Sequence, residues 1–258
     1  MKLIPIFKFT LLCCFAITLG VQAIEDRVDI DPNDELDPGE KISWKMTAST
    51  YANSAQGASN DVNIRGNTEK LAFWVGYYDQ SKVFEQTRMG MEYTHPLPVG
   101  RLIGSLQVAT ENFQGWSLTW DGKKADEHGF GSLIGISRTN LMPYYNLNFD
   151  PNDSLLIGGS YSSSKMGKVI FYQIYDDRLD TGQRVTHLVW RRSLPEGKRI
   201  TIDAFDRTGA SALGEMVYRG TGMTATMDFN DWFVRVGHDP NANFTPGNIS
   251  RVSIGYRF

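Results

Sequence analysis

Cysteine is nearly missing from this 258-residue chain, and long hydrophobic runs are missing as well. The two cysteines, Cys13 and Cys14, both lie in the apolar run from Phe9 to Leu19 near the N-terminus. If that run is removed with a signal peptide, the remaining chain has no disulfide and no thiol nucleophile. No later segment approaches the roughly 18 apolar residues that a transmembrane helix needs. If the mature chain spans a membrane, it must do so with strands.

Runs of basic residues are also lacking. The chain holds 26 Lys and Arg against 29 Asp and Glu, a formal net charge of −3. Loss of residues 1–23 would remove two basic residues and no acidic one, which leaves a net charge of −5. Nucleic-acid binding requires a basic patch or stripe. We therefore predict that nucleic acid is not a partner.

The N-terminus has the features of a secretory signal peptide. Lys2 and Lys8 precede and flank the apolar run, and Val21-Gln22-Ala23 fits a small-residue cleavage site. We predict that residues 1–23 are the signal peptide and that the mature chain starts at Ile24. Leu12 stands before Cys13 where a lipoprotein site has a small residue, so we expect no lipid anchor.

Residues 24–40 are acidic and show no alternation, and we predict that they form a periplasmic arm. The segment from Asp29 to Glu40 has oxygen-bearing side chains at the spacing of an EF-hand calcium loop. Asp34 stands where that loop needs glycine for its sharp turn, and Lys41 starts a strand pattern instead of a helix. The arm is therefore expected to be a solvated linker without a bound metal.

From residue 41 to residue 258, apolar and polar residues alternate with a period of two, which indicates β-strands with two different faces. We count about twelve strands. Loops are expected at Ala52–Gly66, Thr139–Asp153 and Asp239–Gly247, and a short periplasmic turn at Asp79–Val83. The predicted strands are Lys41–Tyr51, Asn67–Tyr78, Phe84–His95, Arg101–Trp120, Gly129–Arg138, Ser154–Ser163, Lys168–Asp176, Arg184–Ser193, Lys198–Arg207, Leu213–Phe229, Asp231–His238 and Asn248–Phe258.

The C-terminus is the most informative segment, because Val252, Ile254, Tyr256 and Phe258 alternate with polar residues up to an aromatic carboxyl end. This segment resembles the terminal signal strand of bacterial outer-membrane β-barrels. The resemblance implies an all-β fold, a closed antiparallel transmembrane barrel spanning 41–258 in a Gram-negative outer membrane. It also implies outer-membrane lipid and the barrel-assembly machinery as partners. The alternative is a soluble β-sandwich, whose core also takes alternating aromatic residues.

In a membrane barrel the apolar face of each strand faces lipid, so the polar face is predicted to line the lumen. An excess of basic residues there would favour passage of small anionic solutes, whereas mutual pairing would fill a narrow barrel. The sequence leaves both possibilities open. The predicted charged lumen residues are Lys45, Arg88, Glu92, Arg101, Arg138, Asp203, Asp228, Arg235, Arg251 and Arg257.

Catalytic signals are weak. The segment from His238 to Asn241 is similar to the His-Asp-Ser-Asn segment of outer-membrane phospholipase A, but Pro240 occupies the position of the nucleophile. No zinc spacing, phosphate loop or pair of catalytic carboxylates is present. We predict a porin-like channel for small solutes without cofactor or metal. The alternatives are a lipid-modifying enzyme and a structural or adhesive barrel with a plugged lumen.

Overall fold

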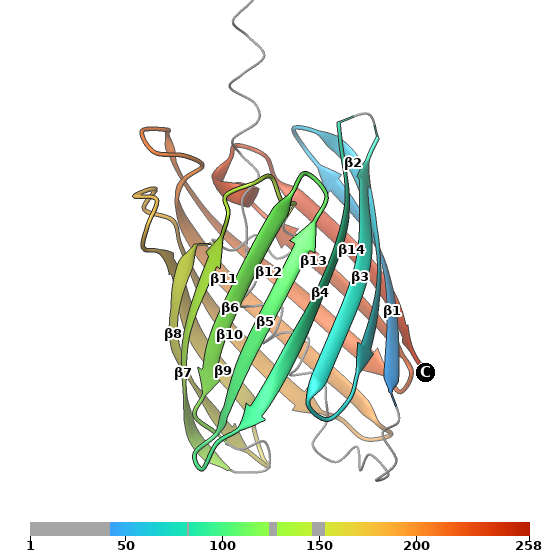
Figure 1. Ribbon diagram of the computed structural model, residues 1–258. Coiled ribbons are helices and arrows are strands. Elements are labelled where there is room, and N and C mark those ends of the chain that lie inside the picture. The colour runs from blue at the N-terminus through green and yellow to red at the C-terminus, as the bar shows by residue number, and fades with distance from the viewer. Residues whose placement is uncertain (1–41, 82, 124–127, 146–152) are drawn as a thin grey trace, which may run out of the picture.

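The computed structural model describes residues 42–81, 83–123, 128–145 and 153–258, in which the chain forms fourteen antiparallel strands closed into one barrel (Figure 1). The predicted signal peptide and acidic arm, 1–40, lie outside these residues. No helix among the described residues is long and apolar enough to cross a bilayer. The strands are β1 (Ser43–Asn53), β2 (Gly57–Asn67), β3 (Leu71–Gln80), β4 (Phe84–Pro96), β5 (Arg101–Ala109), β6 (Phe113–Asp121), β7 (Gly129–Thr139), β8 (Ser154–Ser163), β9 (Gly167–Asp176), β10 (Arg184–Ser193), β11 (Lys198–Ala210), β12 (Val217–Phe229), β13 (Trp232–Asp239) and β14 (Ile249–Arg257).

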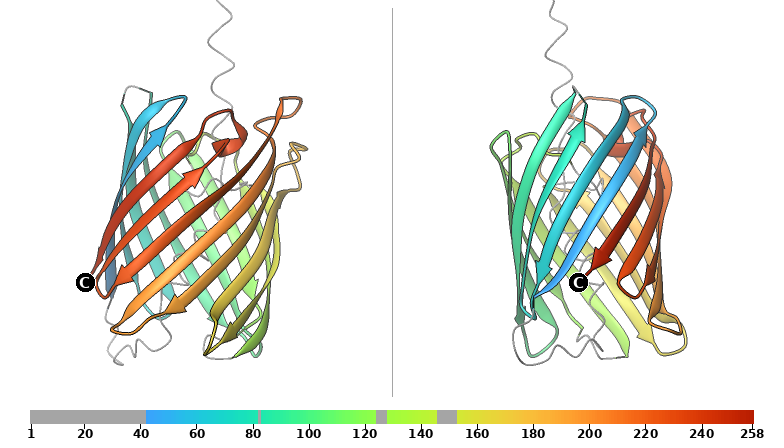
Figure 2. Two further views of the ribbon diagram at one scale, coloured as in Figure 1. Left: turned by 180° about the vertical axis from the view of Figure 1, so that it is seen from behind. Right: turned by 90° about the vertical axis from the view of Figure 1, so that its right-hand side faces the viewer.

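The first and last strands close the barrel. Each strand pairs with its sequence neighbours, and β1 pairs with β14 in a register that runs from Lys45 opposite Arg257 to Asn53 opposite Ile249. Figure 2 shows the blue β1 lying beside the red β14. Trp44 and Phe258 exchange backbone hydrogen bonds of 2.8 and 2.9 Å, so the C-terminal residue itself extends the ladder. Closure leaves no sheet edge to meet lipid.

The predicted strand count of about twelve is too low by two. The first missing strand is β2, whose residues were expected to form the loop Ala52–Gly66. It is rich in Gly, Asn and Asp, and only Val62 and Ile64 give it large apolar side chains on the exposed face. Because turn residues dominate its composition, the segment has the sequence pattern of a loop although it pairs on both sides.

The second missing strand comes from Arg101–Trp120, which was expected to be one long strand and is the hairpin β5–β6. Glu111 and Asn112 adopt left-handed backbone conformations with φ of 59° and 61°, which turns the chain. Ala109 pairs with Phe113 four residues later. Four is an even number, so the apolar alternation continues in phase through the turn and imitates an unbroken strand.

The two ends of the barrel differ in their connections. We call the end where β1 begins and β14 ends the periplasmic end, and the opposite one the outer end. The long connections Thr139–Asp153 and Asp239–Gly247 belong to the outer end, as predicted, and the second contains the 3-10 turn Ala242–Phe244. Because β2 reverses the chain once more, the turn Asp79–Val83 lies at the outer end instead of the predicted periplasmic end.

The outward face of the barrel is apolar. Its exposed side chains include Leu106 and Val252, which are 59 % and 58 % exposed although they are aliphatic. Aromatic rings gather at the periplasmic end, where Trp232 lies 4.6 Å from Tyr256 and Tyr256 lies 5.7 Å from Phe258 between ring centroids. An apolar band with aromatic residues at its border is the surface that a bilayer requires.

Candidate functional site

Nine of the ten predicted lumen residues lie on the inward parity of their strands. Arg88, Glu92 and Asp228 are at most 3 % exposed, whereas the apolar residues that alternate with them are exposed. Since the exposed parity faces outward, these buried charged groups face the interior of the barrel. The nine are Lys45, Arg88, Glu92, Arg101, Asp203, Asp228, Arg235, Arg251 and Arg257.

Arg138 differs from the prediction. It shares the outward parity of β7 with Ile134 and Ile136 and forms an ion pair of 2.7 Å with Asp177 at the outer rim. The pattern of β7 was misleading because Leu133, on the inward parity, is apolar too. A strand with apolar residues on both faces gives no reliable parity.

Several inward charged residues were not predicted. Asp61 and Arg65 belong to β2, which the sequence presented as a loop. Arg199 and Arg207 have the same parity as the predicted Asp203 on β11, so extending the alternation along that strand would have found them. The remaining unpredicted ones are Asp121, Lys123, Lys168, Asp176, His187, Arg191 and Asp239.

Ion pairs balance the charge in the outer half of the lumen. Arg88 donates to Asp61 at 2.5 Å, and Arg207 lies 2.9 Å from Asp239. The Arg88, Asp61 and Arg207 side chains are at most 3 % exposed. Deeply buried charges of this kind require a partner, because removal from water costs several kcal/mol per ion. These pairs therefore link strands that are two apart in the barrel, β2 to β4 and β11 to β13, and add little net potential.

The periplasmic half is strongly basic. Among described inward residues within four positions of a periplasmic strand end, or buried in an adjoining turn, nine cations accompany three acids. We call this set the basic ring. The cations are Lys45, Arg65, Arg101, Lys123, Lys168, Arg191, Arg199, Arg235 and Arg257, and the acids are Glu92, Asp121 and Asp228.

One part of the basic ring surrounds the inward ring of Phe233. Lys45, Arg257 and Arg235 lie 4.9, 5.1 and 5.8 Å from its centroid, within the range of cation–π attraction. Asp228 accepts from Arg257 at 2.6 Å. The strands β1, β13 and β14 thus bring cations to one aromatic surface, which we call the Phe233 cluster.

The β7–β8 connection contacts the opposite wall inside the outer half. The Tyr145 amide donates to the Gln86 side chain at 3.1 Å, and the Tyr145 ring stacks on Tyr78 at 3.8 Å. Tyr144 stacks on Phe113 at 4.3 Å and hydrogen bonds with the Gln107 side chain. Burial raises the pKa of both loop phenols, so they stay neutral at pH 7. We call Pro143–Tyr145 the tyrosine brace; it narrows the outer half.

The wall formed by β7 to β10 is largely apolar on its inward face. Leu156, Ile170, Ile174 and Val189 form one buried cluster there. His187 lies beside this cluster; its Nδ1 lies 3.0 Å from the Asp203 carboxylate, and its ring stacks 4.6 Å from Tyr172. Together with the brace, this wall limits the width available for solutes.

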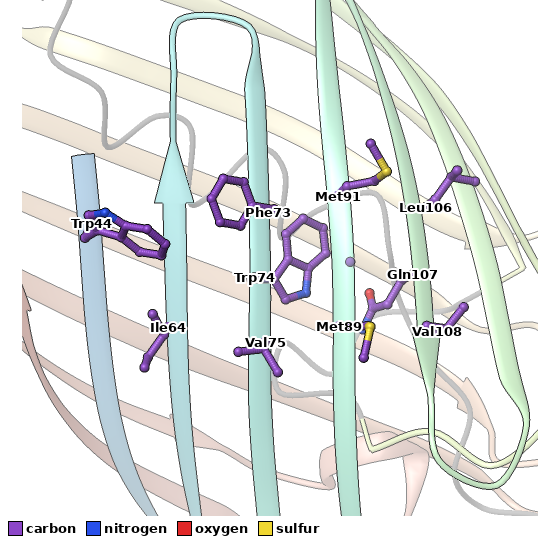
Figure 3. A pocket seen from close by; sticks show the side chains of 11 residues that line it. Trp44, Ile64, Phe73, Trp74, Val75, Met89, Met91, Leu106, Gln107 and Val108 are labelled. Carbon is purple, nitrogen blue, oxygen red and sulfur yellow. The ribbon is translucent and has the colours of Figure 1, made fainter. Parts of the chain in front are cut away.

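The outward face carries two features that lie outside the lumen. An apolar groove of about 550 Å³ runs over β1–β5 (Figure 3). Its lining includes Phe73, Met89 and Leu106, all of outward parity, so it belongs to the lipid-facing surface. At the outer rim, His238 Nδ1 lies 3.0 Å from the Ser250 hydroxyl on the neighbouring strand.

That histidine–serine pair is not a complete catalytic triad. Within the described part of the chain, Ser250 is the one side chain that hydrogen bonds to His238, and no acid or amide orients the imidazole. Nor do the described residues bring together three or more side chains that could hold a metal ion. In the fold, Ser250 therefore lies beside the histidine of the hydrolase-like motif, but the acid or amide of a triad is still missing among the described residues.

The residues of the predicted assembly signal lie along β14. Val252 and Ile254 are 58 % and 49 % exposed on the outward face, and Tyr256 and Phe258 extend the same parity to the periplasmic belt. The motif thus occupies the outer surface of the closing strand.

Comparison with solved structures assigns the fold. The crystal structure of the Acinetobacter baumannii outer membrane protein Omp33 matches with a TM-score of 0.56 and 10 % identity, over 85 % of this chain and 100 % of that chain. The chain has the fold of an outer-membrane β-barrel. The NanC porin gives a TM-score of 0.47 at 5 % identity, over 83 % of this chain and 100 % of that chain. No protein-family model and no curated protein sequence matches.

Proposed function

We propose that this outer-membrane barrel is a channel through which small solutes pass, with anions favoured over cations. The observation that carries the proposal is the basic ring, in which nine cations accompany three acids. Six of the nine cations are arginines, which stay protonated at any physiological pH, so the ring stays positive and raises the local anion concentration. A lumen needed only for stability would gain more from balanced pairs, such as those of the outer half.

Polar atoms without a protein partner also support a wet interior. Arg88 Nε and Nη1 and the Gln107 side-chain oxygen are buried and have no hydrogen-bond partner in the described part of the chain. Leaving such groups dry costs about 1–3 kcal/mol each. We propose that water reaches these atoms when the lumen conducts, since a path for water is the minimum that a small solute needs.

Proteoliposome swelling tests the proposal. Liposomes containing the barrel should swell in an isosmotic solution of a small sugar faster than protein-free liposomes. The rate should fall as the sugar becomes larger, because the tyrosine brace and the apolar wall limit the width. A swelling rate equal to that of protein-free liposomes would instead favour the structural or adhesive barrel.

The second candidate function is hydrolysis of outer-membrane lipid, and the His238–Ser250 contact is the observation that favours it. Because no third group orients the imidazole, we expect no labelling of Ser250 by a fluorophosphonate probe. Ser250→Ala is the matched control. Labelling that disappears in the Ser250→Ala variant would establish a reactive serine and revive the enzyme hypothesis.

A further inference from the structure

The acidic arm is the one sequence feature that a simple channel leaves unused. Residues 25–40 contain eight Asp and Glu and a single basic residue, Arg27. The arm leads directly into β1, which begins at Ser43 at the periplasmic end. Lys45, the third residue of that strand, already faces the lumen and belongs to the basic ring. The most acidic segment of the chain is therefore joined to the most basic part of its interior.

The Phe233 cluster supplies a surface that suits carboxylates. Lys45, Arg235 and Arg257 approach one aromatic ring, and Asp228 is shared between Arg257 at 2.6 Å and Arg199 at 3.3 Å. One described carboxylate thus serves two guanidinium groups. Further carboxylates would relieve the repulsion between Lys45, Arg235 and Arg257, which approach the same aromatic ring.

A second cluster continues the ring on the opposite wall. Lys168 on β9 lies near Arg101, Lys123 and Arg191, with Asp121 as the neighbouring carboxylate. Arg101 donates to Asp121 at 3.0 Å. Four cations again accompany one acid, so the excess of positive charge extends around the periplasmic mouth.

The arm is long enough to reach both clusters. Sixteen extended residues span at most about 55 Å. Fourteen strands spaced by ~4.8 Å and tilted by ~40° give a backbone diameter of roughly 28 Å. An arm attached beside β1 can therefore cross the periplasmic mouth from the Phe233 cluster to the Lys168 cluster.

We propose that the basic ring is a binding site for carboxylates and that residues 25–40 of the same chain occupy it from the periplasmic side. Charge complementarity supplies the attraction, and covalent attachment to β1 supplies a high effective concentration. The bound arm competes with anionic solutes for the same cations. Although the ring is also the basis of the proposed channel, binding of the arm does not require conduction.

Zero-length carbodiimide cross-linking of the full-length protein tests this contact, because it joins carboxylates to lysine amines only where they touch. In the wild-type chain we expect cross-links from the arm to Lys168 or Lys123. In an Arg235→Lys variant a further link should form at position 235, beside Phe233. The matched control is Arg251→Lys, inward on β14 but toward the outer end, where no link should form.

A neutral-arm variant, in which every Asp and Glu of residues 25–40 becomes Asn or Gln, should show none of these links. Arm links confined to exposed turn lysines such as Lys70 and Lys165, or equal links at positions 235 and 251, would overturn the proposal. Protection of Lys168 by citrate without any arm link would assign the ring to free anions and overturn it too. If liposomes fail to swell while the arm links form, the channel fails and the arm site stands.

Discussion

The outer and periplasmic halves of the lumen are built from the same strands and differ in charge. In the outer half, Arg88 and Arg207 each have a buried carboxylate partner, and the tyrosine brace fills part of the width. In the periplasmic half, cations outnumber acids, and Asp228 is shared between two arginines. The outer half therefore stabilises and narrows the barrel, whereas the periplasmic half supplies an electrostatic potential.

This difference separates two roles that charged groups inside a barrel can have. A buried ion pair fixes the positions of the strands it joins, because each ion compensates the charge of the other at a distance near 3 Å. An excess of charge of one sign lowers the stability of the barrel through repulsion, and it attracts counter-ions into the lumen. The basic half of the lumen lies at the end of the barrel where the acidic residues 25–40 lead into β1.

Loss of barrel closure should give the largest effect, because neither half of the lumen forms when the barrel does not close. Phe258→Asp places a charge on the lipid-facing belt and weakens the strand that pairs with β1. A charge on this face costs up to about 4 kcal/mol at the bilayer midplane and about 1 kcal/mol or less near the interface, so most of the expected effect comes from the weakened pairing of the closing strand. We expect almost no heat-modifiable, folded protein in the outer membrane, with Phe258→Tyr assembling normally. Wild-type amounts of folded Phe258→Asp protein would contradict the role of this residue.

Breaking an outer-half pair should have the next largest effect. Asp61→Asn leaves Arg88 charged and buried, which should lower the free energy of unfolding by about 3–5 kcal/mol. The matched change in the periplasmic half is Asp228→Asn, which should cost less because the Arg257 side chain is 21 % exposed. Urea unfolding in detergent measures both. A larger loss for Asp228→Asn would reverse the assignment of roles.

Removing the tyrosine brace should widen the outer half without changing its charge. Tyr145→Ala deletes the ring that stacks on Tyr78 at 3.8 Å. We expect a higher single-channel conductance at unchanged ion selectivity. Tyr161→Ala, on the outward face of β8, is the control and should leave conductance unaltered. Equal conductance in the Tyr145→Ala and wild-type proteins would mean that the brace does not limit the path.

Neutralising part of the basic ring should give the smallest effect, a graded loss of anion preference. Lys45→Gln with Arg235→Gln removes two of the three cations around Phe233 and leaves the backbone pairing intact. The reversal potential in a salt gradient should shift toward zero. Arg192→Gln, exposed on the outward face, should not shift it. An unchanged potential in the double variant would show that the ring does not select ions.

The sequence predicted the barrel better than it predicted the strands. The apolar alternation of β4 and the aromatic end of β14 placed Arg88, Glu92 and Phe258 on the faces where they are found. Such strands have one apolar face because lipid lies on one side and a polar lumen on the other. Where a strand has lipid on one side and a polar lumen on the other, the period of two assigns each residue to a face.

The failures have physical causes of their own. β2 carries few apolar residues, and the β5–β6 hairpin preserves the alternation because Ala109 and Phe113 are four residues apart. Arg138 was misplaced because β7 faces an apolar part of the lumen. The ion pairs, the brace and the Phe233 cluster join residues that are far apart in the sequence, so the alternation along a single sequence does not reveal them.

The reversal potential of the full-length protein and of the neutral-arm variant in a potassium chloride gradient tests the central claim most directly. Excess cations in the periplasmic half predict a preference for chloride in both proteins, and a stronger one in the neutral-arm variant, whose arm has no carboxylates to compete with chloride. A preference for potassium in the neutral-arm variant would contradict the account.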